Sequence, residues 1–389
     1  MRFVQREQSE RLKTLLRSFP AVLLVGPRQS GKSTLARQAL PGWTHLDLER
    51  SLDFDALAAD VEGFLTANPR LLAIDEAQRM PELFQALRHQ IDRGHGHGRF
   101  LLLGSASPTL MRRVSETLAG RVAIVELTPF LMRELAHTRR ADDRWFWGGF
   151  PPVLALGDAH ARVEWLGAYV STLLERDLPA LGVALPHRRL RTLWTMLTHV
   201  HGNLLNVADL ARSLGVSSHT VAADLDVLEG AFMIRRLPPY FANVHKRLTK
   251  SPKLYVRDTG LLHHLAGLRR PGDLATWSRR GASFEGLVIE ELAALASSRL
   301  VRPEIFFWRT QAGAEVDMII VEGRKILPIE IKLGTSVDGH GCAGLRQCMK
   351  DLNLRRGWVV TTSEEPRALA PGVDLVPWKQ IATGEIDLF

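Results

Sequence analysis

The sequence of 389 residues predicts an α/β protein with a parallel sheet, a basic helical middle region and a second α/β region. Three observations support this prediction. Strand-like apolar runs alternate with helical segments in the first third, two short amphipathic helices meet at a glycine in the middle, and an alternating strand, ILPIEIKLG, lies in the last third. The predicted parts span 1–140, 141–185 (a helical linker or lid), 186–275 and 276–389.

The strand-like run AVLLV at 21–25 leads into the pattern G-x-x-x-x-G-K-S. The predicted cofactor-binding residues are Gly26, Pro27, Arg28, Gln29, Ser30, Gly31, Lys32, Ser33 and the helix residue Thr34. Glycines let backbone N–H groups surround the phosphates, Lys32 reaches the β- and γ-phosphates, and the Ser33 hydroxyl coordinates magnesium. The following helix directs the positive end of its dipole at the same anion. The pattern predicts ATP and Mg2+ as cofactors.

A second apolar run, Leu71–Ile74, ends in Asp75 and Glu76, as a Walker B strand does. Asp75 is predicted to hold the magnesium, and Glu76 to orient or deprotonate the attacking water. The alternative is that this acidic pair caps the next helix. Two acids with different tasks predict hydrolysis in addition to binding.

Two more apolar runs complete the predicted parallel sheet. Phe100–Leu103 is followed by Gly104 and Ser105, and Val122–Leu127 follows an arginine-bearing segment that ends at Arg121. This alternation of strands and helices is typical of a P-loop fold.

Eight motifs together resemble bacterial and archaeal AAA-superfamily ATPases that join a P-loop core to a C-terminal domain of unknown function. The motifs are GPRQSGKST, LLAIDEAQ, LLLGSAS, LAGRVAIVELTPF, GGFPPVL, KLYVRDTGLLHHL, GAEVD and IEIK. The resemblance covers nearly the whole chain. It implies an ATPase with DNA-linked accessory domains and leaves the biological task open.

The likeness to ring-forming ATPases implies two further residues of the ATP site. In such rings a polar residue at a strand tip senses the γ-phosphate, and an arginine reaches the nucleotide of a neighbouring subunit. Ser105 and Arg121 match these roles, with Arg112 and Arg113 as alternatives for the arginine. The structural alternative is an arginine that is solvated or paired with a nearby acid. A trans-acting arginine implies a homo-oligomer, expected as a hexameric ring.

The formal net charge of +8 is concentrated in the middle of the chain. Residues 181–280 hold 15 Lys or Arg and 6 Asp or Glu, a net of +9. Such an excess is typical of binding to phosphate backbones, although RNA, an acidic partner or a solvated surface gives the same pattern. No apolar run reaches the roughly twenty residues that span a bilayer, and the polar start lacks a signal-peptide core. A soluble, cytoplasmic protein without a membrane partner is expected.

The middle region carries a helix-turn-helix pattern. Asn206 can cap a helix Val207–Leu214, Gly215 can supply the turn, and Ser217 can cap a second helix from Ser218 to Leu228. One apolar stripe on each helix predicts a buried face.

A β-hairpin formed by Phe232–Leu237 and Lys253–Val256 would complete a winged-helix module that binds DNA. The predicted DNA-binding residues are Ser218, His219, Arg235, Arg236, Lys246, Arg247, Lys250 and Lys253. The alternative is a winged helix that packs only against protein. No base sequence is predicted, because the second helix has few side chains suited to reading bases.

The last third holds a separate set of charged residues. Asp317 ends the motif GAEVD, and Glu330 and Lys332 share one face of the next strand because side chains alternate. This resembles the PD-(D/E)XK nuclease fold, in which two carboxylates hold magnesium and the lysine activates water. Glu285, in the helix SFEGLVIEEL, matches an extra acid of that fold.

The match to the nuclease pattern is incomplete. Asp317 follows Val316 where the nuclease pattern has proline, and Glu315 is an alternative ligand, with Gln311 nearby to help position that edge. The alternative is a scaffold that keeps the fold without the activity, with the charged residues on an exposed strand.

The joint presence of the three parts predicts an ATP-driven machine that remodels or translocates duplex or branched DNA. The first alternative is a nucleotide-gated signalling or defence switch, in which ATP alters assembly. The second is an ATP-regulated, metal-dependent endonuclease.

Overall fold

A computed structural model gives the fold. It describes residues 4–68, 71–94, 96–104, 114, 116–180, 186–241, 251–335, 337 and 341–389. The chain forms two compact units. The first comprises Met1–Phe130 with Gly230–Phe232, and the second comprises Leu131–Glu229 with Met233–Phe389.

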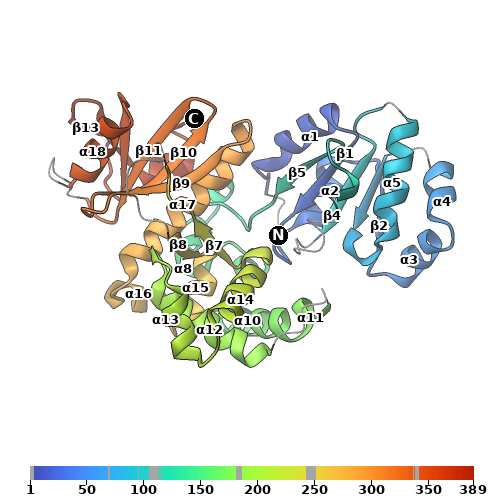
Figure 1. Cartoon of the computed structure of the whole chain (residues 1–389), viewed down its shortest axis with the longest axis horizontal. Helices are drawn as coiled ribbons and strands as arrows, with labels where there is room; N and C mark the ends of the chain where they lie inside the picture. The colour runs from blue at the N-terminus through green and yellow to red at the C-terminus, as the bar shows by residue number, and fades with distance from the viewer. Residues whose placement is uncertain are drawn as a thin grey trace. The chain divides into compact units, whose positions relative to one another are not determined.

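A five-stranded parallel sheet forms the centre of the first unit, in the order β2-β3-β4-β1-β5 (Figure 1). Its elements are α1 (Gln8–Ser18), β1 (Ala21–Val25), α2 (Lys32–Ala39), β2 (Thr44–Asp47), α3 (Ser51–Ala58), α4 (Val61–Ala67), β3 (Leu72–Asp75), η1 (Ala77–Arg79), α5 (Glu82–Arg93), β4 (Phe100–Gly104) and β5 (Val122–Glu126). The predicted parallel P-loop sheet is confirmed. Strand β4 separates the strand before the P-loop, β1, from the Walker B strand, β3.

Alternate side chains of the apolar strands enter two different cores. Leu23 of β1 packs with Leu83 and Leu87 of α5, whereas Val22 packs with Leu12 of α1 on the opposite face. Helices α1 and α2 cover one face of the sheet and α3, α4 and α5 cover the other (Figure 1). Burial on both faces explains why these strands are continuously apolar instead of alternating with polar residues.

The second unit begins with helices and a small antiparallel sheet, ordered β6-β8-β7. The elements are α7 (Met132–Leu135), α8 (Arg144–Trp147), α9 (Pro151–Ala155), α10 (Ala159–Thr172), η2 (Leu173–Asp177), α11 (Leu178–Ala180), α12 (His187–Val200), β6 (Asn203–Leu204), α13 (Val207–Leu214), α14 (Ser218–Gly230), β7 (Ile234–Leu237), β8 (Lys253–Val256), α15 (Thr259–Leu265) and α16 (Pro271–Thr276). The Asn206 side chain accepts from the backbone N–H groups of Ala208 and Asp209, and Gly215 ends α13 with φ of 66°. Local capping therefore sets the bounds of this helix, as predicted.

A mixed six-stranded sheet in the order β13-β14-β12-β11-β10-β9 completes the second unit. Its elements are α17 (Arg280–Arg299), β9 (Glu304–Arg309), β10 (Glu315–Glu322), β11 (Lys325–Lys332), α18 (Ala343–Asp351), β12 (Gly357–Thr361), β13 (Arg367–Ala370), β14 (Val373–Pro377) and α19 (Trp378–Thr383). Strands β9, β10 and β11 are antiparallel, while β11, β12 and β14 run parallel. Leu287 of α17 packs on Ile329, and Leu345 of α18 packs with Ile319 and Val359 of the opposite core, so the two helices cover opposite faces.

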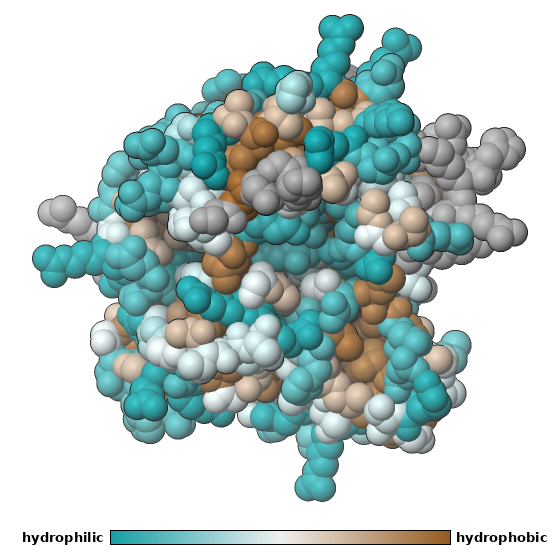
Figure 2. Space-filling view, turned by 90° about the vertical axis from the view of Figure 1, so that its left-hand side faces the viewer, coloured by the Kyte–Doolittle hydropathy of each residue, from teal (hydrophilic) through white to brown (hydrophobic). Residues whose placement is uncertain are grey.

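Hydrophilic residues cover most of the face shown in Figure 2, and hydrophobic residues form separate patches. Among the residues that the structure describes, the large hydrophobic side chains that stay exposed are Leu52, Leu71, Ile124, Phe241 and Val301. Across the part of the chain that the structure describes, no helix combines the length and apolar character needed to cross a bilayer.

Candidate functional site

The P-loop lies between β1 and α2 and has the backbone shape that phosphate binding requires. Gly26 has φ of 153°, and a Cβ atom there would lie 2.2 Å from the carbonyl oxygen of Leu127. Gln29 has φ of 62° and Gly31 has φ of 97°, so the loop uses left-handed positions just before α2. The loop therefore needs glycine at position 26, where any side chain would overlap the neighbouring backbone.

Lys32 is held inside this loop. Its ammonium donates to the carbonyl oxygens of Gly26 at 2.9 Å and Pro27 at 3.0 Å, and the residue is 6% exposed. Burial lowers the pKa of Lys32 to about 8, against the raising effect of Glu76 and Asp75. An anionic phosphate beside the ammonium would favour its charged form and replace the two neutral carbonyl partners.

The two predicted magnesium residues touch each other. The Ser33 hydroxyl, in the first turn of α2, donates to Oδ2 of Asp75 at the end of β3. Asp75 Oδ1 accepts from the Glu76 backbone N–H at 3.0 Å. An oxygen pair of this kind suits a hard divalent cation.

Glu76 follows directly and occupies a strained position. Its φ is 53°, a left-handed value for a residue with a side chain, and Gln78 Nε2 donates to its Oε2. Burial raises the pKa of Glu76, while Lys32 and Arg28 oppose the shift. A strained, desolvated carboxylate next to the predicted magnesium ligand has the properties expected of a general base.

The remaining polar groups of the loop also fit a Mg2+-ATP complex. The Ser30 side chain is fully buried, and its hydroxyl has no hydrogen-bond partner among the described residues. Arg28 pairs with Glu49 at 2.7 Å, and Thr34 lies inside α2. If Mg2+-ATP binds here, Lys32 and the loop N–H groups would hold the phosphates, and Ser33 and Asp75 the metal.

Sequence reasoning missed Arg6, which supports the P-loop. Arg6 is 5% exposed, its Nη1 donates to the Ser30 carbonyl at 2.9 Å, and its Nη2 donates to the carbonyl of Thr128. Its guanidinium also lies over the ring of Phe130, 4.7 Å from the centroid. A lone arginine before α1 carries no local signal for this role, because its partners are distant in sequence.

The predicted sensor and arginine residues are only partly described. Ser105, Arg112 and Arg113 lie outside the described residues. Arg121 makes a bidentate pair with Asp92, with Nε to Oδ1 at 2.7 Å and Nη2 to Oδ2 at 3.1 Å. Its trans-acting role stays a prediction, and that role requires the guanidinium to leave Asp92.

The structure pairs the two predicted DNA-contacting arginines of the small sheet with acids of the protein. Arg235 of β7 binds Glu290 of α17, as Arg257 does with Nε to Oε2 at 2.8 Å. Arg236 binds Glu229 and, at 2.7 Å, Asp226, both on α14. These guanidiniums are already neutralised within the protein, so they are poor candidates for phosphate contacts.

Lys253, a third predicted DNA-contacting residue, is buried at the start of β8 with 2% exposure. Its ammonium lies 3.0 Å from Glu285 Oε1 and 3.2 Å from Asp317 Oδ1, and it also contacts Glu315. Burial would lower the pKa of Lys253, but the surrounding acids outweigh it and raise the pKa well above its usual value. This residue therefore faces the predicted nuclease-like site and not the solvent.

The other predicted members of that site lie nearby. Lys332 pairs with Glu330 Oε1, whereas Glu330 Oε2 is buried without a hydrogen-bond partner among the described residues. Burial, with Asp317 beside it, raises the pKa of Glu330 to about 8 and that of Glu285 to about 7. Gln311 is exposed in the turn between β9 and β10.

Ser218 and His219 are exposed at the start of α14, as a DNA-contacting helix start requires. Lys246, Arg247 and Lys250 lie outside the described residues. DNA contact by these five residues stays a prediction.

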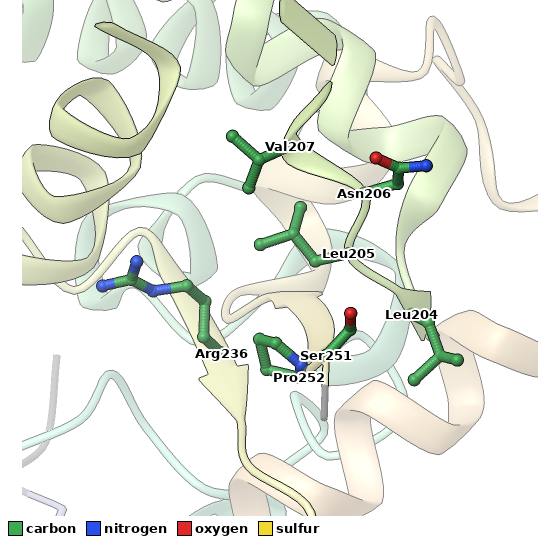
Figure 3. Close-up of a pocket in the computed structure, with 7 residues that line it drawn as sticks. All are labelled: Leu204, Leu205, Asn206, Val207, Arg236, Ser251 and Pro252. Carbon is green, nitrogen blue, oxygen red and sulfur yellow. The ribbon is translucent and has the colours of Figure 1, made fainter. Parts of the chain in front are cut away.

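A pocket of about 720 Å3 opens beside the small sheet (Figure 3). It is lined by Leu204, Leu205, Asn206, Val207, Arg236, Ser251 and Pro252. Figure 3 places Arg236 on β7, across from Val207 and Asn206 at the start of α13. Its lining offers one already paired cation and no acid, so it supplies no chemistry for catalysis.

Three family models match successive parts of the chain. Residues 18–136 match an AAA domain, residues 138–272 a domain of unknown function (DUF8612), and residues 280–381 a second domain of unknown function (DUF4143). The AAA match agrees with the P-loop and Walker B geometry described above.

Two relatives cover almost the whole chain. An uncharacterized protein of Mycobacterium tuberculosis is 42% identical over 387 residues, which is 98% of this chain and 86% of that protein, and one of Mycobacterium bovis matches equally. Among solved structures, a Walker-type ATPase of Pyrococcus abyssi is 17% identical, with a TM-score of 0.47 over 67% of this chain and 95% of that chain.

Proposed function

Because the chain contains an AAA domain and belongs to the same family as these mycobacterial proteins, we propose that it is a Mg2+-dependent ATP hydrolase. The contact between Ser33 and Asp75, with Glu76 next in the chain, is the observation that carries the proposal. It brings the end of the P-loop and the end of the Walker B strand together. Binding alone would not require a desolvated glutamate at this position.

Each residue of the site has a distinct task in this proposal. Lys32 and the loop N–H groups hold the phosphates and stabilise their charge, and Ser33 with Asp75 orients the metal. A magnesium ion held there would supply positive charge against the negative charge that develops on the phosphate oxygens. Glu76 accepts a proton from the attacking water, and Gln78 keeps its carboxylate in place.

Lys32→Ala is expected to reduce ATP binding or turnover at least about tenfold, because charge-assisted hydrogen bonds contribute about 1.5 to 3 kcal/mol each. Turnover is measured by phosphate release and binding by a fluorescent ATP analogue. Lys13→Ala, which removes an exposed lysine paired with Glu10 on α1, is the control and should behave like the native chain. A loss smaller than tenfold in Lys32→Ala would count against Lys32 as the phosphate lysine.

For the task that ATP serves, we favour a nucleotide-gated switch, in which ATP alters the assembly of a homo-oligomer, over a machine that grips DNA. Helix α14 contains no Lys or Arg and carries Asp224, Asp226 and Glu229. Asp224 is fully buried and accepts two bonds from Arg189. These acids are paired inside the protein, and α14 offers no cation of its own to the phosphates of a DNA groove.

A second candidate is the ATP-driven machine, a hexameric ring that remodels or translocates duplex or branched DNA. The order of α12, α13, α14 and the small β6-β8-β7 sheet supports it, because it is the order of a winged helix-turn-helix module. The exposed Ser218 and His219 at the start of α14 would then make the phosphate contacts.

One set of measurements separates the two candidates. ATP turnover is measured without nucleic acid and with single-stranded DNA, linear duplex and a four-way junction, and the molar mass is measured with ADP and with a non-hydrolysable ATP analogue. A switch should change its mass between the nucleotides, with turnover constant within about twofold across the DNAs. Tenfold or greater stimulation by one DNA form would instead support the DNA machine.

A pair of variants tests the trans-acting arginine in the same assays. Arg121→Ala should lower turnover if the guanidinium reaches a neighbouring subunit's nucleotide. Asp92→Ala breaks the same surface pair and leaves the arginine free, so it should keep turnover. If the two variants change ATP turnover equally, Arg121 serves only as the surface partner of Asp92.

A further inference from the structure

The acid cluster of the second unit consists of the carboxylates of Glu285, Glu315, Asp317 and Glu330. It is where the nuclease-like fold would hold a divalent cation. A positive charge is already at its centre, because the Lys253 ammonium contacts Glu285, Glu315 and Asp317. The residues therefore do not fit a metal ion.

The surroundings of Lys253 hold the ammonium in this position. Its Nζ lies 5.8 Å from the ring centroid of Phe307, and the Tyr255 hydroxyl, two residues along β8, donates to the same Glu285 oxygen. Asp317 uses its other oxygen to accept from the Ile331 backbone N–H at 2.9 Å. Both oxygens of Asp317 are thus engaged by protein donors.

The backbone of Lys253 is fixed as well. Strand β8 is the central strand of the small sheet, and Lys253 is in register with Leu204 of β6 and Leu237 of β7. Withdrawal of the ammonium would require the centre of this sheet to move. The backbone therefore fixes Lys253 at the cluster.

A second, backbone connection joins the small sheet to the large one beside the cluster. After β7, the Tyr240 N–H donates to the Phe307 carbonyl at 2.7 Å, and the Phe307 N–H donates to the Pro238 carbonyl at 3.0 Å. This segment covers the otherwise open edge of β9. Ionic and backbone contacts thus join the same two sheets.

Two further cations offset part of the negative charge at the joint. Arg309 pairs with Glu315 at 2.7 Å, and Lys332 pairs with Glu330. Among the described residues, no group of three or more His, Cys, Asp or Glu side chains is arranged to hold a metal ion.

We propose that Lys253 is the permanent counter-ion of the acid cluster, in the position that a divalent cation takes in the nuclease fold. The cluster is an ionic joint that fixes the small sheet to the large sheet within the second unit, and it supports no metal-dependent DNA cleavage. The proposal is independent of ATP hydrolysis, so its failure would leave the proposed ATPase untouched.

Removal of the ammonium tests the joint. Lys253→Met in the full chain leaves buried carboxylates uncompensated, and the melting temperature of the second unit should fall by at least about 6 °C. Adding Glu285→Gln to Lys253→Met removes one of these charges and should restore at least half of the loss. Lys379→Met, at an exposed lysine of α19, is the control and should melt like the native chain.

Mn2+ binding without nucleotide, measured by electron paramagnetic resonance, tests the metal itself. Asp75→Asn removes Mn2+ binding at the P-loop, which would otherwise add to the signal. In this variant the acid cluster should bind no Mn2+ at millimolar concentration. Mn2+ binding that survives Asp75→Asn and disappears when Asp317→Asn is added would overturn the proposal. Magnesium-dependent DNA cutting lost in Asp317→Asn, an unchanged melting temperature in Lys253→Met, or no recovery in the double variant would also overturn it.

Discussion

Glu76→Gln is expected to lower ATP turnover by at least about a hundredfold while ATP binding persists, because glutamine cannot accept the proton of the attacking water. Glutamine keeps the size of the side chain, and its carbonyl can still accept from Gln78. Phosphate release measures turnover, and a fluorescent ATP analogue measures binding. The separation of these two effects distinguishes a catalytic base from a residue that shapes the loop.

The matched control is Glu82→Gln, at an exposed glutamate in the first turn of α5. It removes the same negative charge from the same unit and should keep full turnover. If Glu76→Gln hydrolyses ATP as fast as the control, the base lies elsewhere and Glu76 serves only the turn after β3. A loss of ATP binding equal to the loss of turnover would point to a disrupted P-loop.

Local features of this fold could be predicted from the sequence. The apolar runs around β1, β3 and β4 predicted the sheet, and the motif at 26–33 predicted the loop whose serine donates to the Walker B acid. The bounds of α13 follow from its cap Asn206 and from Gly215, which are adjacent in the chain. Short-range rules suffice where the interacting groups are neighbours in sequence.

Long-range pairing could not be predicted, because no local pattern encodes it. Lys253 reaches Glu285 across 32 residues and Asp317 across 64 residues, and Arg6 reaches Thr128 across 122 residues. The positive charge of the middle region was therefore interpreted as a surface for DNA. In the structure, much of that charge faces acids of α14, α17 and β10.

Two family motifs also have a structural meaning. The Gly149 N–H, in GGFPPVL, donates at 2.8 Å to Asp258 of KLYVRDTGLLHHL. The other oxygen of Asp258 accepts from the Leu261 N–H at 3.1 Å and caps α15. These motifs meet each other inside the second unit, which explains their residue types through packing and capping, without a ligand.

The buried ion pairs of Glu290 with Arg235 and Arg257 predict a large loss of stability in Glu290→Gln. Glu290 is 5% exposed and accepts from both Arg235 and Arg257. Its replacement leaves two guanidiniums near a neutral amide, and breaking a buried pair in this way costs about 3 to 5 kcal/mol. Urea unfolding followed by circular dichroism should show this loss at pH 7, whereas Glu365→Gln, at an exposed glutamate, should cost less than about 0.5 kcal/mol.

The loss should depend on pH in a defined direction. Burial alone would raise the pKa of Glu290, but Arg235 and Arg257 outweigh it and lower the pKa from 4.5 to about 2. A carboxylate whose folded pKa lies below its unfolded value stabilises the fold above the unfolded pKa, and this shift corresponds to about 3 kcal/mol. The stability difference between the native chain and Glu290→Gln should therefore be constant above about pH 5. It should shrink as the pH falls from 4.5 towards 2, because the native glutamate then becomes protonated and resembles glutamine. A difference that stays constant over this range, or grows in acid, would show that the two arginines do not hold Glu290 in its charged form.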